Sequence, residues 1–377
     1  MIPDHGAPGP KPGVGTVDKG MLRSLHIIGS RKMGGAEQFF QRLVRGLNGP
    51  DHCATAVVRP GSELRPVVGD STRQFHVPMR NGWDILSGLA IRRLVRKERI
   101  DIVQSYMGRG TRLTRIPQGW GVKHVARLGG YYKIDGYYRH AHAWVGNTRK
   151  LCDYLVQQGL PSERVFYIGN FVEPRPATSP EDRETLRNLL RLPEDAFVLF
   201  ALGRFTEVKG FDDLLPAFAR LPAEVGGRPF FLVIAGDGPL KQKLLAQAAE
   251  LGIEKRLRWA GWQNDPHPYF DLADLFVCPS RHETLGNVIL EAWAHRLPVV
   301  STSSLGGAEL IRDGENGLLV PCQDPVGMAD RMSELIRASD SDRSRIAERG
   351  YQTLCSEHSP EAVLAAYRAL YQELLTA

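Results

Sequence analysis

The sequence predicts an α/β protein with two domains, each an open and mostly parallel sheet covered by helices on both faces. Two long passages alternate short apolar runs with helical patterns, which is typical of parallel sheets buried on both sides. Each passage begins with an apolar run that ends at a glycine, Gly29 in the first and Gly203 in the second. Pro174, Pro176 and Pro180 lie between the passages, and 377 residues suffice for two domains of ~100–200 residues each.

The first passage contains five predicted strands and two predicted helices. The strands are residues 22–28, 54–58, 102–104, 123–128 and 143–145, and the helices are residues 36–47 and 83–99. The second helix has apolar residues at a spacing that predicts one buried face, namely Ile85, Leu86, Leu89, Leu94 and Val95. Its other face is basic and carries Arg92, Arg93, Arg96, Lys97 and Arg99.

The second passage repeats this organisation. Its predicted strands are residues 196–202, 230–235, 257–260, 275–278 and 298–301, and its predicted helices are residues 211–220, 240–251 and 287–295. Both halves therefore read as Rossmann-like domains, whose sheets bind ligands at the carboxyl ends of their strands. We expect a disordered tail at 1–20, an N-terminal Rossmann-like domain at 21–173, a C-terminal Rossmann-like domain at 174–358, and a helix at 359–377 that returns to the first domain.

Composition narrows the class of protein. No run approaches ~18 uncharged apolar residues, so no membrane-spanning helix is expected. The Pro- and Gly-rich start lacks the apolar stretch of a signal peptide. Five scattered cysteines without a Cys-x-x-Cys pair imply neither a zinc site nor a disulfide framework. These features favour a cytoplasmic protein.

Charge is divided unevenly along the chain. Residues 1–170 hold 26 Lys and Arg against 12 Asp and Glu, a balance of +14, whereas residues 171–377 have a balance of −8. A basic half favours an anionic partner, and nucleic acid, anionic lipid and a phosphorylated glycan all qualify. A solvated basic surface without a partner explains the same numbers.

Two cations follow the first strand of the second passage. In Gly203-Arg204-Phe-Thr-Glu-Val-Lys209-Gly210 the glycine permits a sharp turn, and Arg204 and Lys209 lie five residues apart. An arginine that binds in two places and a lysine that adds a point charge suit a diphosphate. Two merely solvated side chains are the alternative. The ATPase phosphate loop is excluded, because its Gly-x-x-x-x-Gly-Lys-Ser/Thr pattern is absent.

A pair of glutamates follows a later strand. Glu283 and Glu291 are eight residues apart, with Gly286-Asn287 between them opening a predicted helix. Free N–H groups at a helix start receive phosphates or sugar hydroxyls, and a carboxylate can accept hydrogen bonds from ribose. The alternative is a surface glutamate followed by a helix-start charge. In the first passage Gly34-Gly35 permits close backbone approach to a ligand, but a full dinucleotide fingerprint is absent.

Together these stretches resemble the retaining glycosyltransferases of the GT-B type, within the group numbered four. The ordered motifs span residues 197–321 and include Gly203-Arg204…Lys209-Gly210, Gly261-Trp262, Glu283-x7-Glu291 and Asn316-Gly317. The resemblance implies sugar transfer from a nucleotide-sugar donor with the anomeric configuration kept, and without a metal ion or other cofactor. The ordered motifs contain no cluster of metal-ligand residues, which agrees with the last point.

The resemblance also implies a role for each matching residue. Arg204 and Lys209 would neutralise the donor diphosphate, and Glu283 would hold the transferred sugar; we take these three as the catalytic set. The remaining donor-binding residues would be Gly35, Gly203, Trp262, Gln263, Leu285, Gly286, Asn287 and Glu291, with Glu291 on the ribose. Many relatives have a histidine after the strand at 102–104, and this chain has none. The acceptor-side candidates are therefore Gln104, Tyr106, Arg127 and Tyr132.

The acceptor is expected to be a glycan or a lipid-linked glycan. Gly129-Gly-Tyr-Tyr-Lys133 and Gly146-Asn147-Thr148 resemble the transferases of bacterial envelope and lipopolysaccharide glycans. The basic helix suggests docking on an anionic membrane face through Arg92, Arg93, Arg96 and Lys97. A nucleotide-sugar epimerase of the same architecture is one alternative. A nucleic-acid-binding protein is another, although no basic-aromatic motif supports it and no nucleic acid is expected.

Overall fold

The computed structural model describes residues 20–64 and 72–376, so the predicted tail at 1–20 lies almost wholly outside the described residues. The first domain is built on a seven-stranded parallel sheet in the order β3-β2-β1-β4-β5-β6-β7. Its strands are β1 (Leu22–Ile28), β2 (His52–Val58), β3 (Gln74–His76), β4 (Ile102–Tyr106), β5 (Lys123–Leu128), β6 (Ala143–Gly146) and β7 (Val165–Tyr167). The strand predicted at 22–28 therefore has the observed bounds.

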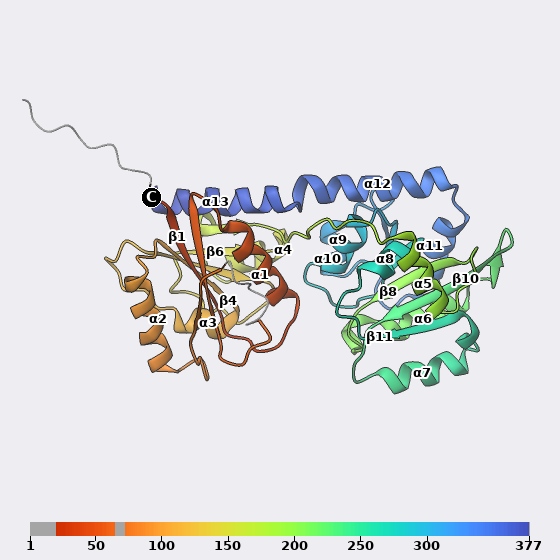
Figure 1. Cartoon of the computed structure of the whole chain (residues 1–377), viewed down its shortest axis with the longest axis horizontal. Coiled ribbons are helices and arrows are strands. Elements are labelled where there is room, and N and C mark those ends of the chain that lie inside the picture. The colour runs from red at the N-terminus through yellow and green to blue at the C-terminus, as the bar shows by residue number, and fades with distance from the viewer. Residues whose placement is uncertain (1–19, 65–71, 377) are drawn as a thin grey trace, which may run out of the picture.

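Helices cover both faces of this sheet (Figure 1). They are α1 (Gly35–Leu47), α2 (Ile85–Lys97), α3 (Met107–Leu113) and α4 (Arg149–Gln157), with a 3-10 turn, η1 (Ser162–Arg164). The core on one face is built around α1, with Phe39 and Phe40 fully buried, and the core on the other face contains Ile91 and Val95 of α2. Helix α1 thus brings the loop containing Gly34 and Gly35 to the carboxyl end of β1.

The second domain has a parallel sheet in the order β11-β10-β8-β12-β13-β14, with β9 antiparallel on β10. Its strands are β8 (Phe197–Leu202), β9 (Glu224–Val225), β10 (Arg228–Ala235), β11 (Leu257–Gly261), β12 (Leu275–Cys278), β13 (Val299–Thr302) and β14 (Leu318–Val320). Its helices are α5 (Pro180–Leu189), α6 (Phe211–Ala219), α7 (Lys241–Glu250), α8 (His267–Leu272), α9 (Asn287–Ala294), α10 (Leu305–Leu310), α11 (Pro325–Arg337) and α12 (Asp340–Glu357), with 3-10 turns η2 (Glu207–Lys209) and η3 (Glu254–Arg256). Two Rossmann-like domains are present, as the sequence predicts.

The last helix, α13 (Pro360–Thr376), packs on the first domain (Figure 1). Tyr367 and Tyr371 are fully buried in the same core as Phe39, and Leu364 lies close to Gly46 of α1. The chain therefore crosses between the domains twice, once after β7 and once between α12 and α13. None of the described helices is long and apolar enough to cross a membrane.

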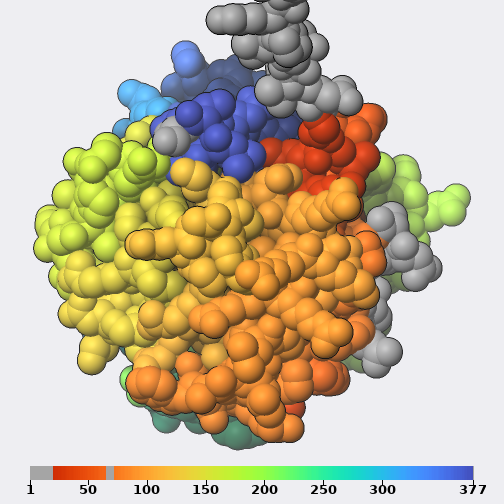
Figure 2. All heavy atoms as spheres, turned by 90° about the vertical axis from the view of Figure 1, so that its left-hand side faces the viewer, coloured from red at the N-terminus to blue at the C-terminus, as the bar shows by residue number. Residues whose placement is uncertain are grey.

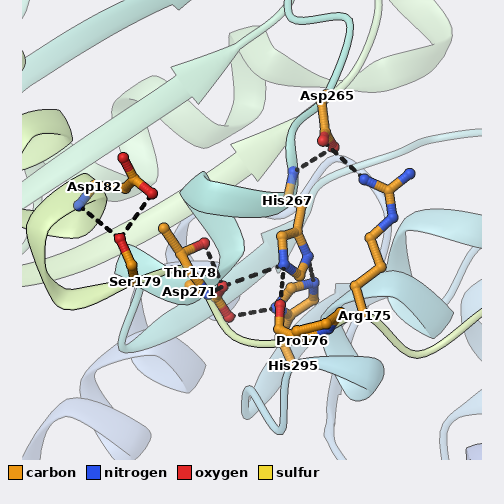
Figure 3. A network of polar contacts seen from close by, with 9 residues as sticks. All are labelled: Arg175, Pro176, Thr178, Ser179, Asp182, Asp265, His267, Asp271 and His295. Carbon is orange, nitrogen blue, oxygen red and sulfur yellow. Dashed lines mark hydrogen bonds and ion pairs between the residues drawn. The ribbon is translucent and has the colours of Figure 1, made fainter.

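The first crossing is anchored to the second domain by polar contacts (Figure 3). His267 donates from Nε2 to the carbonyl oxygen of Pro176 at 2.7 Å. Asp271 accepts from the main-chain N–H of Thr178 at 2.7 Å and from its hydroxyl at 2.6 Å. Because α8 supplies both His267 and Asp271, the linker runs along the second domain before α5 begins.

His295 extends this linker network. Its Nδ1 donates to Asp271 at 2.7 Å, and its Nε2 lies 2.9 Å from Nδ1 of His267 (Figure 3). Among the described residues, His267, Asp271 and His295 are the one group whose ring nitrogens and carboxylate lie close enough together to hold a metal ion. Their ring nitrogens and the carboxylate are engaged with one another and with the linker, so the hydrogen bonds account for the cluster.

Helix α2 corrects one prediction. Three of the residues expected on its buried face are exposed: Ile85 at 77%, Leu86 at 71% and Leu89 at 52%. The other two expected residues do face the core, since Val95 is buried and Leu94 packs against the same cluster. Ser87 and Ile91 complete the buried face, at i and i+4 before Val95 at i+8. The prediction is therefore wrong only for the N-terminal half of the helix, whose apolar residues form a surface. Residues 75–110, in orange, make up much of the end face of the first domain in Figure 2.

Candidate active site

A lysine and a glutamate from two loops meet at the carboxyl end of the second sheet. Lys209 follows β8, Glu283 follows β12, and the Lys209 ammonium donates a hydrogen bond to the Glu283 carboxylate. Burial acts to lower the pKa of Lys209, but the charge of Glu283 and this hydrogen bond outweigh it, so the pKa is raised. Lys209 is therefore a permanent, partly buried cation at physiological pH.

The backbone of the two loops is held rigidly. Gly210, next to Lys209, has a φ of +64°, and a Cβ there would lie 2.1 Å from the carbonyl oxygen of Pro279. Only glycine fits this position, both because of its left-handed conformation and because of the contact. The N–H of His282 also donates to the carbonyl of Val208 at 3.1 Å. These contacts thus hold the loop after β8 against the loop after β12.

The second glutamate lies where the two domains touch. Glu291, in α9, pairs with Arg42 of α1 at 3.7 Å. Burial raises the pKa of the Glu291 carboxyl, although the charges of Arg42 and Arg175 act in the opposite direction. A partly buried carboxylate shared between domains has the capacity to accept hydrogen bonds from hydroxyls of a ligand held there.

The start of α9 contacts the glycine loop of the first domain. Gly286 caps the helix with a φ of +87°, and a Cβ at Gly35 would lie 3.1 Å from Nδ2 of Asn287. Leu285 is buried against Gly306, where a Cβ would come within 2.5 Å of the Leu285 carbonyl carbon. The structure therefore brings Gly35, Leu285, Gly286 and Asn287 into one region, with the free N–H groups of a helix start beside it.

The other predicted donor-side residues follow the carboxyl ends of β8 and β11, two strands that β10 separates in the sheet. Arg204 is exposed, and no carboxylate lies within ion-pair distance of it among residues 20–64 and 72–376. A Cβ on Gly203 would lie 3.7 Å from Cδ of Lys209. Trp262 is 64% exposed after β11, and the Gln263 side chain donates to the carbonyl of Ala260 at 2.5 Å. Gly203 and Arg204 thus belong to the same loop as Lys209, whereas Trp262 and Gln263 follow a strand farther along the sheet.

The acceptor-side candidates divide into two groups. Gln104 and Tyr106 are 0% and 1% exposed; the Gln104 amide donates to the Tyr106 hydroxyl, and its oxygen accepts from the hydroxyl of Tyr371 in α13. His26 contacts the Tyr106 hydroxyl from β1 at 2.9 Å. Both side chains thus belong to a closed polar core in this conformation and do not reach a surface.

Arg127 and Tyr132 lie near each other at the carboxyl end of β5. Arg127 stacks over the ring of Phe39 at 3.9 Å, and its Nε has no hydrogen-bond partner in the described part of the chain. The pKa of the Tyr132 phenol is raised, mainly by burial. The charge of Arg127 acts to lower it, and the charge of Glu37 acts to raise it further. Tyr132, Arg127 and Glu37 therefore share one electrostatic environment at the carboxyl end of β5.

Three residues of this region have no signal in the sequence. Arg42 pairs with Glu291, Asn170 donates to Asn287 at 2.7 Å, and His358 donates to the carbonyl oxygen of Asn170 at 2.9 Å. Each contact joins segments more than a hundred residues apart, so spacing along the chain does not reveal it. The asparagine before the proline-rich linker is the one position that a search of the domain junction would have reached.

Comparison with known proteins defines the class. Residues 33–175 match the family described as Glycosyltransferase Family 4, and residues 182–353 match Glycosyl transferases group 1. The chain belongs to this glycosyltransferase family, and its fold is GT-B. It is a glycosyltransferase, in agreement with the geometry of the two-domain site.

Particular relatives share nearly the whole chain. The lipopolysaccharide core biosynthesis glycosyltransferase LpsE of Rhizobium meliloti is 38% identical over 341 residues, which cover 90% of this chain and 96% of LpsE. LpsD of the same organism is 29% identical over 363 residues, covering 93% and 98%. Among solved structures, a glycosyltransferase from Rickettsia africae has a TM-score of 0.82 at 18% identity, covering 94% of this chain and 99% of that one. Anabaena HepE, solved with UDP and glucose, has a TM-score of 0.80 at 19% identity, covering 93% and 100%.

Proposed function

We propose that this enzyme transfers a hexose or related sugar from a nucleotide-sugar donor to a lipopolysaccharide-core or lipid-linked acceptor, with retention of the anomeric configuration. The contact between Lys209 and Glu283 at the carboxyl end of the second sheet, followed by Glu291 of α9 at the domain contact, is the observation that carries the proposal. A cation for the diphosphate and a carboxylate for the sugar then lie together. The names of LpsE and LpsD support the acceptor class, and HepE supports a nucleotide-sugar donor.

The residues supply charge and position and need no metal ion. Lys209 and Arg204 would neutralise the diphosphate as the bond between its oxygen and the anomeric carbon breaks. Glu283 would exchange part of its contact with Lys209 for the hydroxyls of the sugar. Glu291 would hold the ribose, and the N–H groups at the start of α9 would bind phosphate or sugar oxygens. Trp262 and Gln263 would border the base.

On the first domain, Tyr132 is the acceptor-side candidate with a partly exposed side chain, and the buried Arg127 and Glu37 lie near it. Closure of the domains would exclude water, which otherwise hydrolyses the donor. The acceptor hydroxyl then replaces the diphosphate oxygen at the anomeric carbon, and its proton leaves with the diphosphate.

The donor is identified by a thermal-shift screen with UDP, GDP and ADP sugars in the presence of EDTA. A ligand at about 100 times its Kd stabilises the folded state by about 2.7 kcal/mol, which raises the unfolding midpoint. We expect one base to give a clear rise. The sugar that binds is then incubated with and without a lipopolysaccharide-core acceptor. Transfer that requires the acceptor supports the proposal, whereas epimerised donor formed without acceptor would show an epimerase.

We further propose that helix α2 docks on an anionic membrane, where a lipid-linked acceptor resides. Trp83 is 76% exposed beside Ile85 and Leu86, and Arg112 stacks over its ring at 3.4 Å. Arg93, Arg96 and Lys97 are exposed on the same helix, and Arg92 is half-buried. Exposed apolar and aromatic side chains next to arginines match an acyl boundary and anionic headgroups, respectively.

A charge-reversal variant tests this docking. With each basic residue worth about 1 kcal/mol at an anionic surface, Arg92→Glu/Arg93→Glu/Arg96→Glu is expected to lose at least tenfold in binding to vesicles that contain phosphatidylglycerol. The matched control, Arg191→Glu/Arg220→Glu/Lys255→Glu, changes three exposed cations of the second domain and is expected to bind as the unmodified protein does. Co-sedimentation measures both. Equal binding of the two variants would refute the docking surface.

A further inference from the structure

Asn170 occupies the point where the two chain crossings meet. It lies between β7 and α5 and is 5% exposed, so its polar atoms must find partners within the protein. Its carbonyl oxygen accepts from Nδ1 of His358, which stands between α12 and α13. Its side chain contacts Arg127, at the end of β5, and Asn287, at the start of α9. Asn170 thus contacts the first domain, the second domain and the segment between α12 and α13 that returns to the first domain.

The chemistry of the side chains decides which group donates and which accepts in these hydrogen bonds. A guanidinium has only donors, so Arg127 must donate to Oδ1 of Asn170. The Nδ2 group of Asn170 is then the one left to donate, and it lies 2.7 Å from Oδ1 of Asn287. Since that oxygen is occupied, the Nδ2 donors of Asn287 turn away from the linker. They lie beside the glycine loop, 3.1 Å from where a Cβ of Gly35 would stand.

We infer that Asn170 is a positioning residue that sets the orientation of the Asn287 side-chain amide. The N–H groups of Asn287 are thereby presented to the phosphate or sugar of the nucleotide-sugar substrate. This inference rests on the proposed function, because it assigns the region beside Gly35 and Asn287 to the donor. The hydrogen bonds from Arg127 to Asn170 and from Asn170 to Asn287, which we call the relay, also link the acceptor-side domain to the loop that binds the nucleotide sugar. A positive charge at one end of the relay therefore dictates which atom faces the ligand at the other end.

Substituting Asn170 by aspartate inverts the relay without removing it. Both carboxylate oxygens accept, so the bond to Arg127 is retained and strengthened by charge. The second oxygen then requires a donor, and Asn287 must turn its Nδ2 toward residue 170. Its Oδ1 would face the anionic ligand, and we expect the Kd for a nucleoside diphosphate and the donor KM to rise about tenfold.

Asn170→Ala is the variant that separates this role from a structural one. Alanine deletes both contacts and leaves Asn287 free to rotate, so donor affinity is expected to fall only about threefold. A structural role predicts the reverse order, since aspartate keeps its bond to Arg127 and alanine does not. The expected signature is that Asn170→Asp binds donor more weakly than Asn170→Ala while unfolding at the same or a higher temperature.

The measurement is isothermal titration with whichever of UDP, GDP and ADP stabilises the full-length protein most, followed by KM values for donor and acceptor. Donor KM is expected to change more than acceptor KM. If the unmodified protein binds and transfers, but Asn170→Asp binds donor at least as well as Asn170→Ala, the relay is wrong and the proposed function stands. If the unmodified protein binds none of the three nucleotides, both are overturned.

Discussion

Replacing Lys209 by alanine is expected to lower kcat about 10²- to 10³-fold, the size of effect seen when one charge-stabilising donor is removed from an active site. Lys209 is a half-buried cation, and within residues 20–64 and 72–376 its ion-pair partner is Glu283 alone, so its loss leaves that carboxylate without its counter-charge. The negative charge that develops on the leaving diphosphate would then meet the negative charge of Glu283. Steady-state transfer assays with the identified donor measure the change.

Two further variants test whether that result reflects the loss of charge at the diphosphate site. Arg204→Ala is expected to lower turnover sharply as well, because Arg204 is exposed near the same loop. Lys255→Ala removes an exposed lysine of the same domain and is expected to leave both turnover and the unfolding midpoint unchanged. Near-normal activity in both Lys209→Ala and Arg204→Ala, with intact folding, would contradict the assignment of these residues to the diphosphate.

Gly210→Ala is expected to destabilise the second domain and to abolish most transfer activity. An alanine at a φ of +64° costs about 1–2 kcal/mol in backbone energy alone. In addition its Cβ would lie 2.1 Å from the Pro279 carbonyl oxygen, so the loop after β8 must move away from the loop after β12. That movement would separate Lys209 from Glu283, because each belongs to one of these loops.

Gly252→Ala is the matched control for this substitution. Gly252 has a similar φ of +67°, but nothing lies within 4 Å of an added Cβ. It therefore reports the backbone cost without the clash, and we expect a small fall in unfolding midpoint with full activity. Calorimetry and the transfer assay compare the two proteins. If Gly210→Ala matches Gly252→Ala in both measurements, the two loops are not held in the contact described above.

The sequence predicts the sheets well and their edges poorly. Buried central strands such as β1 and β10 are long enough for their apolar runs to stand out, and they lie where expected. The edge strands β3, β7 and β14 have three residues each, too few to show any periodicity. Helix α2 shows a different limit, because an apolar spacing does not reveal whether a neighbour covers it.

The same distinction applies to the site. Lys209, Glu283, Asn287 and Glu291 follow strands or open a helix of one domain, so the general rule that ligands bind at the carboxyl ends of strands places them together. Their partners Arg42 and Asn170 come from the other domain and from the linker, where only the folded chain brings them near. Gln104 and Tyr106 also end a strand, but their side chains point to the face that α13 covers.

The return of α13 also has a consequence for synthesis of the protein. Residues 360–376 supply Tyr367 and Tyr371 to the hydrophobic core of the N-terminal domain, which otherwise consists of residues translated first. Domains generally fold in the order in which they leave the ribosome. Here the core of the first domain stays incomplete until residues 360–376 have been synthesised, which is after the whole second domain, so the second domain can complete its contacts first.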